Sequence, residues 1–254
     1  MLETAYAKLN LELRVLGRRP DGFHDLDTLF AFAEDGDRLS VEEGEGLSLR
    51  VTGDFADRLD SEEDNLVLRA ARLLGGSGAA LTLEKRLPVA AGLGGGSADA
   101  AAALRLLNRW WNLGLGKAEL LALARHLGSD VPACFLSRTV RGTGRGDVLV
   151  DAETPLSGKP LLLINPGIAM ATADVFSRWR GLESTGNDLE PPALELAPVI
   201  GELLESLRAQ HGTRLVAMSG SGATCFAIFE DEAWRDSAEA SLPRRWWRLA
   251  SRLR

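Results

Sequence analysis

The sequence predicts an α+β protein built as two lobes. Stretches that alternate apolar and polar residues, as half-buried strands do, are mixed with helix-like stretches and show no internal repeat. A polar segment with a proline and a glycine at 153–159 divides the chain into a first lobe over 1–152 and a second over 160–254. With 254 residues, the chain is long enough to bury a large core.

In the first lobe, strands are expected to precede most of the helices. Leu9, Leu11 and Leu13 alternate with polar residues, which is the period of a half-buried strand. Asp64 is the expected cap of a helix that ends on Gly75. Further strands are expected at 26–33, 38–43, 47–51, 79–87, 137–141 and 147–151, and helices at 65–74, 98–111, 117–127 and 131–135.

The second lobe is expected to begin with a continuous apolar strand at 161–165. A glycine-rich turn, Met218 to Gly222, lies between strands at 213–217 and 224–229. Helices are expected at 172–179, 194–210 and 232–240.

A glycine-rich loop at 88–97 joins strand 79–87 to helix 98–111. Four glycines fall within five positions: Gly92, Gly94, Gly95 and Gly96. Glycine lets a ligand approach main-chain N–H groups, and the start of a helix adds free amides and a positive dipole end. The loop therefore predicts a phosphate site for a nucleotide, and the alternative is a strand-to-helix turn without a ligand.

Two familiar phosphate loops are excluded. The Walker pattern needs a lysine at the helix start, and no lysine lies between Lys85 and Lys117. The dinucleotide fingerprint needs an early strand–helix–strand unit and an acidic residue about twenty positions on, whereas Glu119 lies inside an amphipathic helix.

Composition favours a globular protein of the cytoplasm. No apolar run approaches the roughly eighteen residues of a membrane span, and the N-terminus has no signal-peptide pattern. Cys134 and Cys225 are far apart in apolar surroundings, so neither a disulfide nor a metal site is indicated. The net charge of −7 argues against a nucleic-acid partner. The basic and aromatic tail from Arg244 to Arg248 is interpreted as a terminal strand or helix rather than an RNA surface.

Three further segments carry residues that suit chemistry. Lys8 and Asn10 share the polar face of the first strand, where a lysine facing water is the alternative. Asp130 comes directly before a short helix, where a plain helix cap is the alternative. The turn from Met218 to Gly222 offers backbone donors that could close over a phosphate or the glycine loop, and a simple hairpin is the alternative.

Taken together, the motifs of this chain resemble the GHMP kinase superfamily, and within it the branch that phosphorylates a cytidine-diphosphate sugar-alcohol. The segments that carry the resemblance are 7–10, 17–24, 91–99, 128–132, 187–190 and 218–222. The resemblance implies a first lobe like domain 2 of ribosomal protein S5 and a ferredoxin-like second lobe. It also implies ATP and Mg²⁺, a small-molecule substrate, and a weak homodimer as a further expectation.

The resemblance also implies a role for each matching residue. Asp130 would take the proton of the substrate hydroxyl, while Lys8 would keep Asp130 ionised and stabilise the transferring phosphoryl group. The residues implied to bind ATP are Pro88, Ala90, Ala91, Gly92, Leu93, Gly94, Gly95, Gly96 and Ser97. Those implied to bind the cytidine substrate are Asn10, Phe23, His24, Thr172, Phe176 and Gly220.

Among these, Phe23 would stack on cytosine, His24 would bind its edge, and Thr172 and Phe176 would close the other side. A loop histidine in water and core packing of the two phenylalanines are the alternatives.

Two departures from the family pattern bear on the site. Ala98 stands where a second serine is common, which leaves Ser97 as the available metal ligand, and Phe23 stands where tyrosine also occurs. Two other functions stay open: another GHMP kinase, of the homoserine or mevalonate type, and a catalytically silent binding protein. The silent protein is disfavoured because Lys8 and Asp130 are both present.

Overall fold

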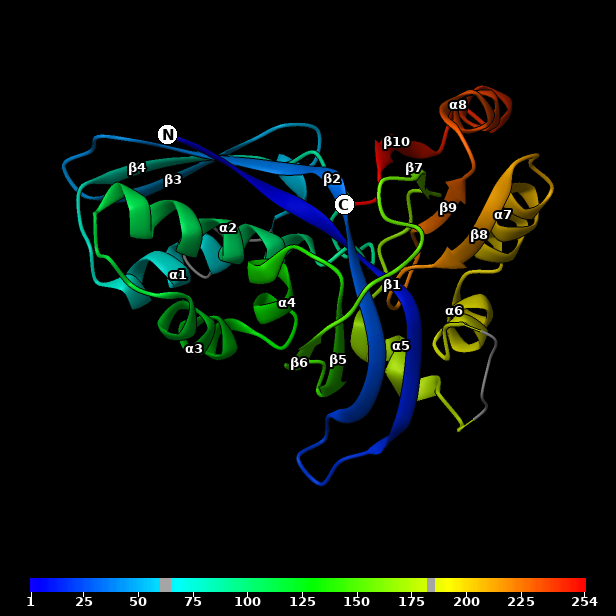
Figure 1. Ribbon diagram of the computed structural model, residues 1–254, viewed down its shortest axis with the longest axis horizontal. Coiled ribbons are helices and arrows are strands. Elements are labelled where there is room, and N and C mark those ends of the chain that lie inside the picture. Colours follow the sequence, from blue (N-terminus) through cyan, green and yellow to red (C-terminus); the bar gives the residue numbers. More distant parts are fainter. Residues whose placement is uncertain (60–64, 182–185) are drawn as a thin grey trace. The chain divides into compact units, whose positions relative to one another are not determined.

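The computed structural model describes residues 1–59, 65–181 and 186–254 (Figure 1). These residues mix helices with strands in two sheets, which confirms the α+β class. Contacts divide the chain into two compact units. Unit 1 comprises 1–7, 35–89 and 94–137, and unit 2 comprises 8–34, 90–93 and 138–254. The chain thus passes between the units several times, and the lobe boundary expected at 153–159 stays a prediction.

Two long strands, β1 (Leu2–Arg18) and β2 (His24–Glu42), contribute residues to both units. The strands expected at 26–33 and 38–43 are one continuous strand. Gly36 lies in the middle of this strand, and a Cβ there would lie 1.9 Å from the Ala5 carbonyl oxygen. Only glycine allows β2 to pass this close to β1.

Unit 1 places helices beside its strands. β4 (Ala79–Glu84) alternates buried and partly buried residues, runs parallel to β3 (Leu47–Thr52), and pairs antiparallel with β2. Asn65 caps α1 by accepting a hydrogen bond from the Val67 amide, and the expected cap, Asp64, lies outside the described residues. The elements are β3 (Leu47–Thr52), a 3₁₀ turn (Ala56–Arg58), α1 (Leu66–Leu74), β4 (Ala79–Glu84), α2 (Gly95–Trp110), α3 (Lys117–Leu127) and α4 (Val131–Leu136).

Unit 2 contains a sheet in the order β10 (Trp247–Arg252), β7 (Pro160–Asn165), β9 (Cys225–Phe229) and β8 (Thr213–Met218), and all six residues of β7 are buried. Its core is built from Leu162, Ile164, Ile200, Leu204 and Phe229 with their neighbours. The elements are β5 (Val140–Gly144), β6 (Val148–Asp151), β7 (Pro160–Asn165), α5 (Thr172–Arg178), α6 (Glu190–Leu196), α7 (Val199–Arg208), β8 (Thr213–Met218), β9 (Cys225–Phe229), α8 (Glu232–Ser241) and β10 (Trp247–Arg252).

Several expected boundaries differ, and the strand expected at 79–87 ends at Glu84. The helix expected at 194–210 is two helices, because Pro198 restricts Ala197 to a non-helical conformation (φ −142°, ψ 83°). The strand expected at 137–141 begins at Val140, because Ser137 ends α4 in the left-handed region. Helix α2 begins at Gly95 instead of 98.

The basic and aromatic tail is part of the fold. β10 pairs antiparallel with β7 along its whole length, Trp246 is buried, and the Arg248 guanidinium donates to the carbonyls of Glu239 and Pro243. Within the described ranges, no helix combines the length and apolar character needed to cross a membrane.

Candidate active site

Lys8 lies buried in unit 2 at the start of a chain of hydrogen bonds. Its Nζ donates to Asn10 Oδ1 at 2.8 Å, Asn10 Nδ2 donates to Thr28 Oγ1 at 2.8 Å, and Thr28 donates to the Glu12 carbonyl at 2.6 Å. Lys8 is 4% exposed, so the alternative of a strand lysine facing water is wrong. Because Thr28 holds the amide of Asn10, the ammonium group has a defined position. The sequence patterns did not single out Thr28.

The first half of the glycine loop, 90–93, is held by main-chain hydrogen bonds within unit 2. The amides of Lys8, Met170 and Thr224 donate to the carbonyls of Leu93, Ala90 and Ala91 at 2.9, 3.0 and 3.2 Å, respectively. These contacts fix the loop against β1, the segment between β7 and α5, and the connection between β8 and β9.

The turn from Met218 to Gly222 packs on this loop segment. Ser219 Oγ donates to the Gly92 carbonyl at 2.9 Å. A Cβ at Gly92 (φ +78°) would lie 2.2 Å from the Ser219 carbonyl oxygen, so the close approach requires glycine. The turn is at once the β8–β9 hairpin connection and a contact of the loop.

Gly220 lies at the centre of this contact. A Cβ there would lie 3.0 Å from the Gly92 carbonyl oxygen and 3.3 Å from Asn10 Oδ1. Asn187 Nδ2 donates to the carbonyls of Met218 and Gly220, both at 2.8 Å. The motif at 187–190 therefore anchors the turn, a role that the sequence alone did not suggest.

Aromatic rings gather around His24 in unit 2. Its ring stacks on Phe176 with centroids 4.7 Å apart and meets Trp179 edge-on at 6.0 Å. Burial, with a smaller contribution from Arg18, lowers the pKa of His24 below its usual 6.5. The imidazole is therefore mostly neutral at pH 7, with one ring nitrogen as donor and the other as acceptor. Trp179 is an addition to the predicted set.

Phe23 and Thr172 contact residues outside this ring cluster. Phe23 is 53% exposed, so core packing is the wrong alternative for it, and the Arg145 guanidinium lies 5.1 Å from its ring centroid. Thr172, exposed at the start of α5, has its Oγ1 3.1 Å from Ser221 Oγ. Phe176 packs against the core of unit 2 as well as against His24.

In unit 1, the second half of the loop forms the first turn of α2. Gly94 adopts the left-handed region (φ 61°) directly before the helix, and the Gly94 carbonyl accepts the Ala98 amide at 2.8 Å. The amides of Gly95, Gly96 and Ser97 precede the first intrahelical donor, and such amides form an anion site at a helix start. Pro88 and Val89 lie between the end of β4 at Glu84 and the loop segment 90–93.

A buried charge cluster lies directly beside this turn. Lys85 Nζ donates to Asp99 Oδ2 at 2.8 Å and to Asp37 Oδ2, while Asp37 Oδ1 accepts the amides of Arg86 and Leu87. A Cβ on Gly95 would lie 3.3 Å from Lys85 Nζ. The sequence patterns missed this cluster, because nothing in its spacing distinguishes it from surface charges.

The cluster carries one more carboxylate than ammonium groups. Burial, followed by the nearby Asp37 carboxylate, raises the pKa of Asp99 to about 7, although Lys85 acts against this shift. Burial alone would lower the pKa of Lys85, but the carboxylates of Asp99 and Asp37 outweigh it and raise that pKa. In the described chain, Asp99 Oδ1 has no hydrogen-bond partner.

Asp130 stands at the N-cap position of α4 but does not act as a cap. Its side chain accepts no capping hydrogen bond from the first turn, and it is only partly buried. Pro132 occupies the first turn, where no amide donor is needed. The alternative role of Asp130 as a helix cap therefore lacks the hydrogen bond that defines a cap.

Among the described residues, no cluster of three or more His, Cys, Asp or Glu side chains is arranged to hold a metal ion. The Ser97 hydroxyl, which the resemblance implies as a metal ligand, is partly buried on the first turn of α2. Such a donor set suits a Mg²⁺ ion that takes most of its ligands from phosphates and water. Burial raises the pKa of the Cys225 thiol, so this side chain is disfavoured as a thiolate, the form in which cysteine binds metals.

Known proteins match this chain over nearly its whole length. Residues 65–138 match the GHMP kinases N terminal domain, and 176–248 match GHMP kinases C terminal. A 4-diphosphocytidyl-2-C-methyl-D-erythritol kinase of Rhizorhabdus wittichii is 52% identical over 99% of this chain and 94% of its own length. The kinase of the same name from Novosphingobium aromaticivorans is 48% identical over 99% and 92%.

Two solved structures are similar in fold to this chain over nearly its whole length. A crystal structure of 4-(cytidine 5'-diphospho)-2C-methyl-D-erythritol kinase superposes with a TM-score of 0.84 at 35% identity, covering 100% of this chain and 99% of that one. Homoserine kinase from Cytophaga hutchinsonii has a TM-score of 0.69 at 17% identity, covering 97% and 94%, and shares the fold.

Proposed function

This chain belongs to the 4-diphosphocytidyl-2-C-methyl-D-erythritol kinases of the GHMP kinase superfamily. We therefore propose that it uses ATP to phosphorylate the 2-hydroxyl group of 4-diphosphocytidyl-2-C-methyl-D-erythritol. The observation that supports a cytidine substrate is the stacked ring pair of His24 and Phe176. A kinase for a small amino acid or for mevalonate has no base to place against these rings.

The base is bound by rings and by a neutral imidazole. Phe176 and Phe23 offer apolar faces for stacking, and His24, with its lowered pKa, donates and accepts at the edge of cytosine. Thr172, Asn10 and Gly220 complete the substrate side of the site.

The transfer needs one proton acceptor and a positive charge. Asp130 takes the proton from the substrate hydroxyl, whose oxygen bonds to the γ-phosphorus while the bridging P–O bond to the β-phosphate breaks and ADP leaves. The buried ammonium of Lys8, held by Asn10, stabilises the charge on the transferring group.

ATP is bound by main-chain amides. The loop at 88–97 supplies these donors without a lysine in the loop, as at other helix starts that bind phosphates. Mg²⁺ bound with ATP would neutralise phosphate charge, and Ser97 would be its protein ligand. A weak homodimer stays a prediction, for which sedimentation velocity is the measurement.

Thermal-shift and ADP-release assays with 4-diphosphocytidyl-2-C-methyl-D-erythritol, homoserine and mevalonate test the proposal. We expect ATP-dependent turnover with the cytidine substrate alone. Turnover of homoserine or mevalonate would point to another GHMP kinase, and binding of ATP without any turnover would point to a silent protein.

A further inference from the structure

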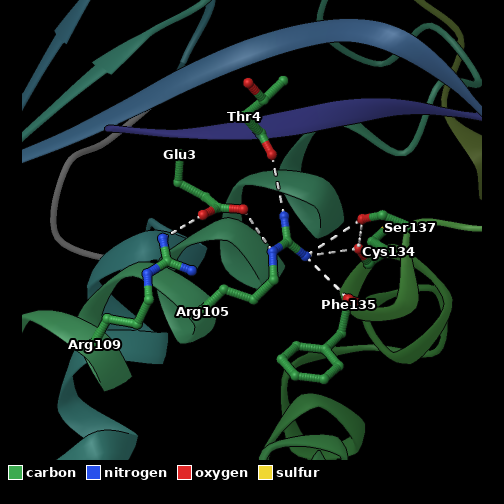
Figure 2. Close-up of polar contacts among 7 residues, drawn as sticks. All are labelled: Glu3, Thr4, Arg105, Arg109, Cys134, Phe135 and Ser137. Atoms are coloured by element: carbon green, nitrogen blue, oxygen red, sulfur yellow. Dashed lines mark hydrogen bonds and ion pairs between the residues drawn. The ribbon is translucent and has the colours of Figure 1, made fainter. Parts of the chain in front are cut away.

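In unit 1, the side chain of Arg105 ends in a cluster of acceptors (Figure 2). Its Nη1 donates to the carbonyls of Cys134 and Phe135 at 3.0 and 3.2 Å and to Ser137 Oγ at 3.4 Å. Its Nε donates to Glu3 Oε1 at 2.7 Å and its Nη2 to the Thr4 carbonyl at 3.1 Å. The guanidinium thus joins α2 and β1 to the C-terminal end of α4.

Helix α4 needs such external support. It has six residues, and a helix this short is marginal without tertiary contacts. Its last carbonyls lack intrahelical donors and carry the negative end of the dipole, so a cation there is favourable. Arg105 meets both needs from the middle of the 16-residue helix α2.

A continuous line of hydrogen bonds connects Arg105 to Asp130. The Cys134 amide donates to the Asp130 carbonyl at 3.0 Å, and the Cys134 carbonyl accepts from Arg105 at 3.0 Å. A displacement of this end of α4 is therefore transmitted to Asp130 through one helical turn.

We propose that Arg105 is a positioning residue for the reaction: by holding the C-terminal end of α4, it sets the position of the Asp130 carboxylate at the other end. This inference rests on the proposed role of Asp130 as the proton acceptor. Glu3 orients Arg105 by accepting from its Nε, and both side chains are largely shielded from solvent, 16% and 14% exposed.

Arg109 provides the matched control. It lies one turn after Arg105 on α2 and donates to the other oxygen of Glu3, Oε2, at 2.5 Å. Its side chain is 50% exposed, and its hydrogen bond in the described structure goes to Glu3 and not to α4.

The experiment compares Arg105→Met, Arg105→Lys and Arg109→Met by kcat, KM and melting temperature. For Arg105→Met we expect kcat to fall about 10- to 100-fold, the cost of a misplaced catalytic group, with both KM values nearly unchanged. Arg105→Lys keeps the charge but not the fork and should recover part of kcat. Arg109→Met should keep the wild-type kcat.

A double-mutant cycle with Asp130→Asn separates positioning from general support of the fold. If Arg105 acts through Asp130, Arg105→Met should reduce the residual kcat of Asp130→Asn very little. An equal fold-loss in both backgrounds, or an unchanged kcat in Arg105→Met, would overturn the proposal while leaving Asp130 as the base. If Asp130→Asn itself retains full activity, the proposed function of Asp130 fails instead. Should Arg105→Met not fold, Arg105→Lys and Glu3→Gln carry the same cycle.

Discussion

At the scale of single residues, Asp130 gives the most direct test, because its two roles predict opposite outcomes. Asparagine caps helices about as well as aspartate, and here no capping bond exists to lose. Asp130→Asn should therefore leave the melting temperature within a few degrees, while kcat falls at least about 100-fold, since a general base supplies roughly 10²- to 10⁴-fold.

The control for this substitution is Asp231→Asn. Asp231 is a true N-cap that accepts the Trp234 amide at 3.0 Å, and it belongs to none of the motifs of the site. It should lose neither stability nor activity. An Asp130→Asn enzyme with more than about a tenth of the wild-type kcat would contradict the role as base.

Cytidine recognition is a second prediction at the residue scale. Stacking on an aromatic side chain contributes roughly 1–3 kcal/mol per base, so Phe176→Ala should raise KM for the cytidine substrate about 5- to 100-fold. KM for ATP should barely change. Phe23→Ala should have a smaller effect, because that ring is 53% exposed and already in contact with Arg145. Calorimetry with CDP is the check, and equal affinity in Phe176→Ala and wild type would refute the ring site.

The buried Asp99 predicts a pH dependence of stability. Its pKa, raised to about 7, lies above the unfolded value of 3.8, so the folded state holds a proton that the unfolded state releases. The stabilising contribution is complete below pH 3.8 and is lost as the pH rises through 7, with a slope of up to about 1.4 kcal/mol per pH unit.

Asp99→Asn should remove this slope in urea titrations between pH 5 and 7. Glu230→Gln is the control with the opposite sign: Arg214 lowers the pKa of the Glu230 carboxyl to about 2, so any contribution is lost only in strong acid. If Asp99→Asn keeps the wild-type slope, Asp99 is not the proton-binding group.

At the scale of elements, the strand–loop–helix unit from β4 to α2 predicts the effect of Gly95→Val. A branched side chain would press against Lys85 Nζ, 3.3 Å from the Cβ position, and project at the first turn of α2. We expect a folded but less stable protein that loses ATP affinity and keeps CDP affinity, as measured by calorimetry.

Gly201→Ala is the matched helix glycine for this substitution. Its Cβ would lie 3.5 Å from Leu194 Cδ2, an ordinary contact, so nucleotide affinity and stability should hold. Unchanged ATP affinity in folded Gly95→Val would remove the loop from the nucleotide site.

At the scale of the whole molecule, the chain path predicts how fragments behave. The core of unit 2 includes Leu13 and Val15 from β1, and β10 at the far end of the chain pairs with β7. A fragment of residues 160–254 lacks β1 and should therefore show no cooperative unfolding by circular dichroism. Addition of a fragment 1–152 should restore it, whereas a cooperative transition of 160–254 alone would show that the second lobe folds independently.

By itself, the sequence determined the element types, the glycine loop and the motif residues, because these depend on local periodicity and on backbone freedom at glycine. For Trp247–Arg252 the sequence left a strand and a helix both open, because its alternation is weak. Pairing with β7 makes it a strand. Pairing across the chain is a property of the fold, so only tertiary structure decided it.

Tertiary structure also decided which polar residues are buried. Lys8 and Lys85 look alike in sequence, and each is buried against different acceptors, Asn10 for one and Asp37 with Asp99 for the other. Desolvation and charge pairing act through distances in space, and spacing along the chain does not encode them. For the same reason, the sequence could indicate Asp130, but only the packing of α2 against α4 revealed that Arg105 holds its helix.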